Sequence, residues 1–255
     1  MVRPKKHLGQ HFLKDENIAR KIIDCLPPET TRVVEVGAGT GVLTKYLLED
    51  KRLEPLFFEI DRESVDYLQK EYPAITGKLI ERDFLEFDLS LIPQPFTIIG
   101  NFPYNISSQI LFRVIDYKDC IPMVIGMFQK EVAERIASPP GSKKYGILSV
   151  LLQAWYNIEY LFTVSENVFI PPPKVKSGVI RLTRNQTTHL GCDEKDFKAL
   201  VKAGFNQRRK TLRNSLGGFQ FNDVPGIKPL LEKRAEQLGI SDFVFLTASL
   251  VKASG

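Results

Sequence analysis

The sequence predicts an α/β protein with two domains: a mostly parallel sheet covered by helices, followed by a small all-α domain. Strand-like and helix-like segments alternate from residue 32 to about residue 135, which is typical of a parallel sheet with helices on both faces. Only short helix-like segments follow the polar stretch 183–189, whose composition is that of a linker. We therefore expect one domain over residues 1–185 and a second over residues 186–255.

The strands of the first domain are expected where apolar runs lie between turn residues. They cover residues 32–36, 55–60, 79–82, 96–100 and 123–128. Two later β-rich runs, 160–164 and 178–182, flank a proline cluster and can pair as an antiparallel edge of the sheet. One helix is expected directly after Gly41. Further helices are expected over residues 62–72, 194–204, 209–215, 228–238 and 241–252.

The composition narrows the class of protein. A chain of 255 residues that is 43% hydrophobic can build a medium domain and a small one. Cys25, Cys120 and Cys192 are far apart and form no CxxC pair, which argues against a disulfide framework and a zinc site. No apolar run approaches the roughly 20 residues of a membrane span, and the basic N-terminus lacks the apolar core of a signal peptide. We expect a soluble, cytoplasmic monomer that contacts no membrane.

The positive charge is concentrated in two stretches without acids. The net charge of +5 is modest, so the placement of the cations matters more than their sum. One stretch is the N-terminal fourteen residues and the other is 208–213, and they predict contacts to nucleic-acid phosphates. The alternative is that these cations only solvate helix surfaces. The residues expected to bind RNA are Lys5, Lys6, Lys143, Lys144, Arg208, Arg209, Lys210 and Arg213.

A glycine-rich loop follows the first predicted strand. "VVEVGAGTGVLT", residues 33–44, places Gly37, Gly39 and Gly41 between a strand and a helix, where open α/β folds bind cofactors. The dinucleotide fingerprint GxGxxG needs Gly or Ala where this chain has Val42, and a P-loop needs GK[ST]. The spacing therefore disfavours both a pyrophosphate and a triphosphate ligand.

Two acids end the next two predicted strands. Glu59 in "LFFEID" lies about 20 residues after the glycines, where a carboxylate can accept from ribose hydroxyls. Asp83 in "IERDF" can accept from an exocyclic adenine amine. Each acid alone is more simply a solvated residue at the start of a loop. Together with the glycines they indicate an adenosine without phosphates, for which S-adenosyl-L-methionine is the best fit.

"NFPYNIS", residues 101–107, follows the fourth strand, next to the expected reactive end of that cofactor. Pro103 can simply end the strand, because it has no N–H to give to the sheet. Alternatively, the Asn101 oxygen and the Pro103 carbonyl accept the two hydrogens of a base amine while Tyr104 stacks on the base. Positioning and electrostatics would then lower the barrier without a strong base.

Five motifs spread over nearly the whole chain resemble one known family. "NFPYNIS" looks like the amine-methyltransferase motif of ribosomal RNA adenine N6-dimethyltransferases. It occurs together with "HLGQHFL" (7–13), "EVGAGTG" (35–41), "FIPPPKVKS" (169–177) and "FNQRRKTLRNSL" (205–216). The resemblance implies a Rossmann-like class I methyltransferase domain with a seven-stranded sheet. The basic last motif favours the branch that dimethylates two adjacent adenines near the 3′ end of 16S rRNA, in the 30S subunit or its precursor.

The resemblance also implies roles for single residues. His11 and Leu13 would line the methionine end of the cofactor, and Phe169 would stack on the second face of the target base. The remaining cofactor residues would be Gly37, Gly39, Glu59, Ile60, Asp83, Phe84 and Asn101, and the catalytic set would be Asn101, Pro103, Tyr104 and Phe169. Phe102 departs from the family, which often has Leu or Ile at that position.

Other functions remain open at this point. One is a ribosome-assembly checkpoint that binds the subunit with incidental methylation, and another is methylation of 23S rRNA. A zinc deaminase is excluded, because its H-x-E and P-C-x-x-C signature is absent. His7 and His11 are four residues apart, but Gly9 lies between them and no third ligand is near, so we expect no metal.

Overall fold

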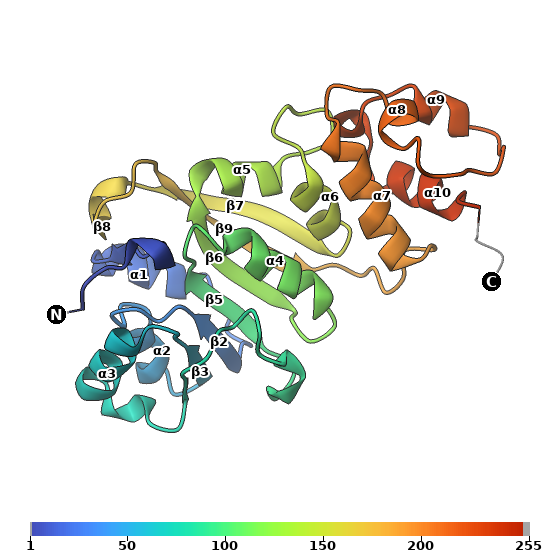
Figure 1. Cartoon of the computed structure of the whole chain (residues 1–255). Helices are drawn as coiled ribbons and strands as arrows, with labels where there is room; N and C mark the ends of the chain where they lie inside the picture. Colours follow the sequence, from blue (N-terminus) through green and yellow to red (C-terminus); the bar gives the residue numbers. More distant parts are fainter. Residues whose placement is uncertain (1, 252–255) are drawn as a thin grey trace. The chain divides into compact units, whose positions relative to one another are not determined.

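The structure is a computed structural model, and it describes residues 2–251 (Figure 1). The chain forms two compact units. The first holds the residues up to Glu134 and Asn157–Arg184, and the second holds Arg135–Tyr156 and the residues from Asn185 onward. The domains expected at 1–185 and 186–255 differ from this division in one segment. Residues 135–156 precede the last strands in the sequence but pack in the second unit, where α6 (Ile147–Gln153) contacts α7 (Glu194–Asn206).

The first unit is built on a mixed sheet of seven strands, in the order β4-β3-β2-β5-β6-β9-β7. Its strands are β2 (Arg32–Val36), β3 (Glu54–Phe58), β4 (Leu79–Ile80), β5 (Thr97–Asn101), β6 (Met123–Gln129), β7 (Tyr156–Val164) and β9 (Ser177–Arg184). The first five are parallel, and β9 runs antiparallel to β6. The α/β class and the antiparallel edge are therefore confirmed.

Alternation along the strands places apolar side chains on both faces of the sheet. The helices of this part of the chain are α1 (Glu16–Ile23), α2 (Thr44–Glu49), α3 (Arg62–Glu71), α4 (Ser107–Asp116) and α5 (Lys130–Ala137). On one face, Ile22 of α1, Leu47 of α2 and Leu68 of α3 pack in one core with Val33 and Phe57. This packing leaves the ends of the strands, where open α/β folds bind ligands.

A second, two-stranded sheet joins segments that are far apart in the sequence. β1 (Phe12–Leu13) pairs antiparallel with β8 (Phe169–Ile170), with Leu13 opposite Phe169. The Lys14 N–H extends the pairing by donating to the Val168 carbonyl at 2.9 Å. Strands of two residues have no measurable periodicity, so the sequence did not predict this sheet.

The second unit is helical, and its core includes Phe197, Leu200 and Phe243. Besides α6 and α7 it contains α8 (Leu212–Ser215), α9 (Ile227–Leu231) and α10 (Ile240–Ala248). The helix expected over 228–238 is broken after α9, because the Lys233 carbonyl accepts from the Leu212 N–H at 2.8 Å. The expected end of the last helix, Lys252, lies outside the described residues. None of the helices between residues 2 and 251 has the length and apolar composition that a membrane crossing needs.

Glu35, in the middle of β2, is a carboxyl group inside the core. Its side chain is only 2% exposed, and burial raises its pKa from 4.5 to about 8. The hydroxyl of Thr44, the first residue of α2, donates to Glu35 Oε2 at 2.7 Å, which partly offsets this shift. At neutral pH the group is therefore mostly protonated, and it joins β2 to the helix that follows the glycine loop.

Replacing Glu35 by Gln should change the pH dependence of stability. The folded chain holds this proton up to about pH 8 and the unfolded chain only to about pH 4.5, so wild-type stability falls as the pH rises through this window. At about 1.4 kcal/mol per unit of pKa shift, the loss is on the order of a few kcal/mol. Urea titrations should show Glu35→Gln gaining stability over wild type between pH 5 and pH 8. An equal change for the exposed control Glu49→Gln would contradict this assignment.

Candidate active site

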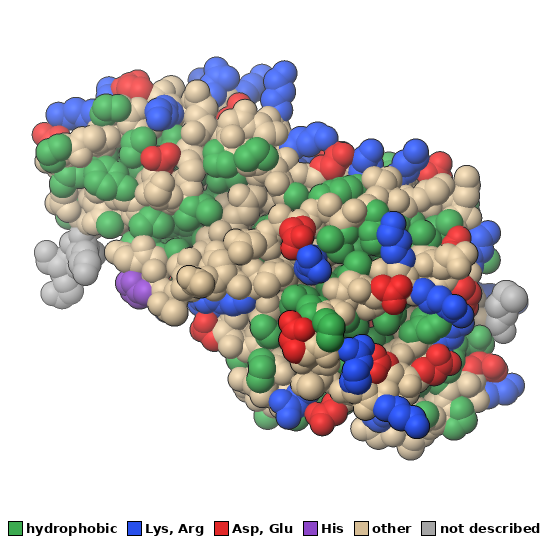
Figure 2. Space-filling model, turned by 180° about the vertical axis from the view of Figure 1, so that it is seen from behind, with side chains coloured by type: hydrophobic (Ala, Val, Ile, Leu, Met, Phe, Trp, Pro, Cys, Tyr) green, Lys and Arg blue, Asp and Glu red, His purple; other side chains and the backbone are tan. Residues whose placement is uncertain are grey.

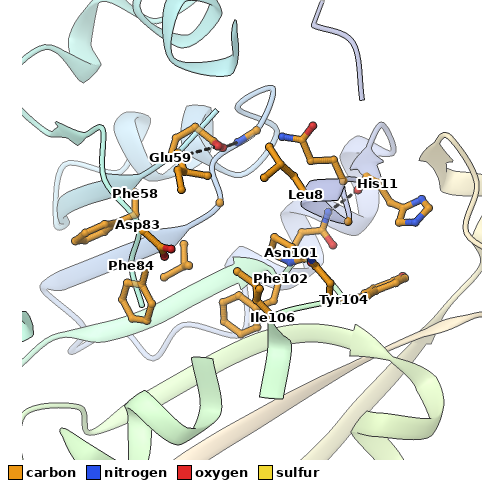
Figure 3. A pocket seen from close by; sticks show the side chains of 18 of the residues that line it. Leu8, His11, Phe58, Glu59, Asp83, Phe84, Asn101, Phe102, Tyr104 and Ile106 are labelled. Atoms are coloured by element: carbon orange, nitrogen blue, oxygen red, sulfur yellow. Dashed lines mark hydrogen bonds between the residues drawn. The ribbon is translucent and has the colours of Figure 1, made fainter. Parts of the chain in front are cut away.

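A pocket lies at the carboxyl ends of β2, β3, β4 and β5 (Figure 3). Glu59, Asp83 and Phe84 line one side of it in this view, and Asn101 and Tyr104 line another. Residues 8–12 of the N-terminal segment complete the wall. The carboxyl edge of a parallel sheet is where open α/β folds bind ligands. Most of the predicted site residues therefore meet in one place.

Glu59 is held in place by the backbone around it. Its Oε2 accepts from the Gly39 N–H at 2.8 Å, and its Oε1 accepts from the N–H groups of Ile60 and Asp61, both at 2.9 Å. Burial raises the pKa of Glu59, and these three hydrogen bonds to the charged form oppose the rise. A carboxylate offers about four acceptor positions, so the donors fix its orientation and still leave capacity for a hydroxyl of a ligand.

The glycine loop depends on backbone conformations that other residues rarely adopt. Gly37 and Gly39 have φ of 77° and 58° and line the pocket. Gly41 also has a positive φ, but a Cβ there would lie 2.3 Å from the Tyr72 ring. Gly41 therefore serves the packing of α3 against the loop, whereas the first two glycines leave room for a ligand.

Asp83 and Phe84 follow β4, the outermost strand of the sheet. Asp83 Oδ1 accepts from the Leu85 N–H at 2.8 Å, while Oδ2 has no hydrogen-bond partner among residues 2–251. The Phe84 ring is buried and meets Phe58 edge-on, with centroids 5.4 Å apart. On the far side of Glu59, Ile60 is 53% exposed at the pocket. Each acid is therefore followed by an apolar residue of the pocket lining, Glu59 by Ile60 and Asp83 by Phe84. Such surfaces suit the apolar faces of a purine ring and a ribose.

Asn101 has a fixed orientation. Its Nδ2 donates to the backbone carbonyl of His11 at 2.9 Å. Because a carbonyl only accepts, this bond identifies the amide nitrogen, and Oδ1 of this pocket residue has no hydrogen-bond partner in the described part of the chain. The N-terminal segment therefore orients the amide oxygen that the sequence predicted as an acceptor for a base amine.

Pro103 and Tyr104 lie in the turn that follows Asn101. The Pro103 carbonyl already accepts from the Ile106 N–H at 3.2 Å, so only its second lone pair is left for an amine. Tyr104 is half-buried, and its hydroxyl lies 2.6 Å from Ser177 Oγ. Burial raises the pKa of Tyr104, and the bond to Ser177 opposes this. The His11 ring lies 5.4 Å from the Tyr104 ring, tilted by 32°.

Phe102 points away from the turn into the core, which explains its role. Its ring is 1% exposed and meets Phe128 edge-on at 5.1 Å. Gly100 and Gly126 are opposite each other on β5 and β6, and a Cβ on them would lie 2.7 Å and 2.3 Å from the Phe102 ring. The two glycines create the space that this larger side chain fills, and the ring anchors the turn between Asn101 and Tyr104.

Two residues that the family resemblance assigned to the site lie elsewhere. Leu13 and Phe169 are 2% and 1% exposed, belong to the hydrophobic core and are absent from the pocket lining. Their opposition in the β1–β8 pair turns both side chains inward. Stacking on a base would require the Phe169 ring to leave this packing, so its expected role stays a prediction. Both residues anchor the wall of the pocket.

Lys5 was expected to bind RNA, but it is paired within the protein. Its ammonium forms an ion pair with Asp61, whose side chain is 1% exposed, and this bond raises the pKa of Lys5. Gln10 Nε2 also donates to Asp61, at 3.3 Å, while the Lys5 N–H donates to Gln10 Oε1 at 2.9 Å. The roles of Asp61 and Gln10 were not predicted from the sequence, although they lie within "LFFEID" and "HLGQHFL". These residues fasten the N-terminal segment to the first turn of α3, so Lys5 is occupied within the protein.

The basic residues of the second unit are also partly paired. Arg208 forms an ion pair with Glu236 at 2.8 Å and donates to the Lys143 carbonyl, and Arg213 pairs with Glu232. The acids that the local sequence lacks are thus supplied by the fold. Arg209 and Lys210 are exposed and have no partner in the described part of the chain. The contact of Arg208 with the Lys143 carbonyl joins the loop of Lys143 and Lys144 to this basic segment. Lys6, in the first unit, is exposed.

The family described as "Ribosomal RNA adenine dimethylase" matches residues 1–236 of the chain. The chain belongs to this family. Its members methylate adenines of ribosomal RNA and use S-adenosyl-L-methionine as methyl donor. The residues present fit that cofactor, because Glu59 and Asp83 are two held acceptors at the pocket and the glycine loop leaves space between them.

Relatives in this family cover nearly the whole chain. "Ribosomal RNA small subunit methyltransferase A" of Parabacteroides distasonis is 59% identical over 97% of this chain and 94% of its own length. The protein with the same name in Cytophaga hutchinsonii is 56% identical over 98% of both chains. Among solved structures, a dimethyladenosine transferase from Plasmodium falciparum superposes with a TM-score of 0.76 at 25% identity, over 92% of this chain and 96% of its own.

Replacing Gly126 by Ala should disturb catalysis through Phe102. The added Cβ would lie 2.3 Å from the Phe102 ring, so the ring and the Asn101 turn attached to it must shift. We expect a loss of stability of about 1–3 kcal/mol and a kcat reduced about tenfold or more, with a smaller change in cofactor affinity. Melting temperatures, kcat and cofactor titrations measure these effects.

Two further variants separate this mechanism from a general effect of alanine. Gly218→Ala, where a Cβ has nothing within 4 Å, is the matched control and should behave as wild type. Phe102→Leu, added to Gly126→Ala, should recover part of the stability because the smaller side chain leaves room for the Cβ. The absence of any recovery in the double variant would count against the proposed clash.

Proposed function

We propose that the protein transfers four methyl groups from S-adenosyl-L-methionine to N6 of two adjacent adenosines near the 3′ end of 16S rRNA. The observation that carries this proposal is the Asn101 amide, which His11 orients and whose oxygen has no partner among residues 2–251, in the same pocket as the carboxylates of Glu59 and Asp83. The names of the relatives support the small subunit as the target. In this proposal the substrate is the 30S subunit or its precursor, and the reaction belongs to small-subunit biogenesis.

Each residue of the site has a chemical task in this reaction. Bound S-adenosyl-L-methionine supplies an electrophilic methyl group. The lone pair of an adenine amine is delocalised into the ring, so the protein has to orient and polarise the nitrogen. Asn101 Oδ1 accepts one amine hydrogen, and the second lone pair of the Pro103 carbonyl is available for the other. Tyr104, held by Ser177, offers a ring face to the base.

The second methylation of each adenine uses the same groups with one contact fewer. A monomethylated amine has a single hydrogen, so only one of the two acceptors can be engaged. The methylamino group must also rotate about the C6–N6 bond to present that hydrogen again. The Asn101 oxygen is the acceptor that remains engaged in this scheme, because its orientation is fixed independently of the substrate.

The cofactor is proposed to bind along the strand ends. Glu59 would accept from the ribose hydroxyls, Asp83 from the adenine amine, and Gly37 and Gly39 would lie under the methionine part. His11 also lines the pocket and faces its reactive side next to Tyr104. Ile60 and Phe84 would pack against the adenine ring.

We also propose that the protein acts in the cytoplasm as a monomer. The three cysteines, Cys25, Cys120 and Cys192, are free thiols, which suits a reducing compartment. The two alternative functions are less well supported. The similarity to the 23S rRNA methyltransferase ErmE, at 23% identity and a TM-score of 0.66, shows the fold alone. A pure binding role would not need the oriented Asn101 amide.

Asn101→Ala should abolish methylation while leaving the subunit-binding surface intact. Incubation with labelled cofactor and undermethylated small subunits should give N6-dimethyladenosine with wild type, and at least about a hundredfold less with the variant, because a positioning contact at the reacting nitrogen is lost. Binding to the subunit, measured by cosedimentation, should change little. The exposed Asn157→Ala is the control. If the wild-type protein forms no N6-dimethyladenosine in 16S rRNA, the proposed activity is wrong.

The pair Arg209→Ala and Lys210→Ala tests RNA binding by the second unit. Both side chains are exposed and without a described partner, so their removal should weaken subunit binding and lower the slope of log K against log salt by about one per phosphate contact. Lys228→Ala, which removes an exposed lysine already paired with Asp223, should leave the slope unchanged. An equal salt dependence of the Arg209/Lys210 variant and wild type would argue against phosphate contacts at these residues.

A further inference from the structure

The loop of residues 170–176, here called the proline loop, presents apolar side chains to solvent. Ile170 is 52% exposed and Val175 is 46% exposed, and Pro171 and Pro172 between them are also exposed. In contrast, Phe169 before the loop and Ser177 after it are buried. The apolar residues are therefore displayed by a segment whose ends are fixed in the core.

Hydrogen bonds hold the proline loop on both sides. At its start, Ile170 pairs with Phe12 in the small sheet. At its end, the Lys176 carbonyl accepts from the Lys130 N–H at 2.9 Å, and Ser177 Oγ lies 2.6 Å from the Tyr104 hydroxyl. Three consecutive prolines with fixed φ angles limit its freedom further. A surface that is held in this way loses little conformational entropy when a partner binds.

The proline loop adjoins the rim of the active-site pocket. His11 and Phe12 both line that pocket. The Pro171 carbonyl accepts a hydrogen bond from His11 Nδ1 at 2.8 Å, and Phe12 is the strand partner of Ile170. A nucleotide chain that delivers a base to Asn101 and Tyr104 has to cross the rim, so its neighbouring nucleotides lie against surfaces of this kind.

Three lysines surround the exposed apolar residues without acidic partners. Lys174 and Lys176 are exposed on the proline loop itself, and Lys14 is exposed next to it, since its N–H donates to Val168. Within residues 2–251 none of the three ammonium groups is in an ion pair, unlike Lys5 or Arg208. Of the acids nearest along the chain, Asp15 caps α1, Glu16 is paired with Lys45, and Glu166 is half-buried. Positive charge beside apolar surface suits a nucleic-acid strand.

We propose that the proline loop binds the RNA strand adjacent to the target adenosine. Ile170 and Val175 contact the apolar faces of a neighbouring base or ribose, and Lys174, Lys176 and Lys14 contact phosphates. In this proposal the buried Phe169 anchors the proline loop in the core, and the exposed residues that follow it contact RNA. This inference rests on the proposed function, because it assumes that an adenine of RNA enters the pocket.

The double variant Lys174→Ala/Lys176→Ala tests the phosphate contacts with the full chain and undermethylated small subunits. We expect KM for the subunit to rise about tenfold, kcat to stay within about twofold, and the salt slope of subunit binding to fall by about two. The affinity for S-adenosylhomocysteine and the melting temperature should equal those of wild type. Lys51→Ala/Lys70→Ala, two exposed lysines distant in sequence from the proline loop, is the matched control and should show none of these changes.

Ile170→Ser tests the apolar contact separately. It should raise KM several-fold with an unchanged salt slope, since no charge is removed. An unchanged KM and salt slope in the double lysine variant would overturn the proposal. So would a raised KM with an unchanged salt slope in that variant, which would indicate a ribosomal protein, rather than RNA, as the partner of the loop. If wild type itself does not methylate small subunits, the proposed function fails, whereas these outcomes leave it standing.

Discussion

The hydrogen bond from the Asn101 amide to the His11 carbonyl is the interaction on which the active site depends. It orients the Asn101 side chain, whose oxygen we propose as the acceptor for a base amine, and it joins the turn of residues 101–106 to the N-terminal segment. The same segment forms a wall of the cofactor pocket. In the proposed reaction this one contact therefore links cofactor binding to the orientation of the amine, and it exists only when the N-terminal segment is in place.

That segment is held by bonds to three different parts of the first unit. Lys5 and Gln10 bond to Asp61 at the start of α3, and β1 pairs with β8. His11 donates to Pro171, and the Asn105 amide donates to the His7 carbonyl at 3.2 Å. Together these bonds order a stretch that has little regular structure of its own.

Packing beneath the turn completes this arrangement. The Phe102 ring occupies the space above Gly100 and Gly126, so the backbone between Asn101 and Tyr104 leaves the sheet at a fixed position. The chain thus accommodates this large ring with glycines on two adjacent strands. The hydrogen bond of Asn101 and the packing of Phe102 together fix the turn that carries the proposed acceptors.

The sequence by itself determined the sheet, the glycine loop and the strand-end acids, because these follow from local periodicity and from the geometry of parallel strands. Val33, Glu59 and Asp83 could be placed without any knowledge of distant contacts. Only the tertiary structure decided the direction of Phe169, the pairing of Lys5 and Arg208, and the orientation of Asn101. These depend on partners 160, 90 or 56 residues away, as for His11 with Pro171, Asn101 with His11 and Lys5 with Asp61. Local patterns carry no information on such partners, since whether a charge is free or a ring is exposed depends on what the fold brings against it.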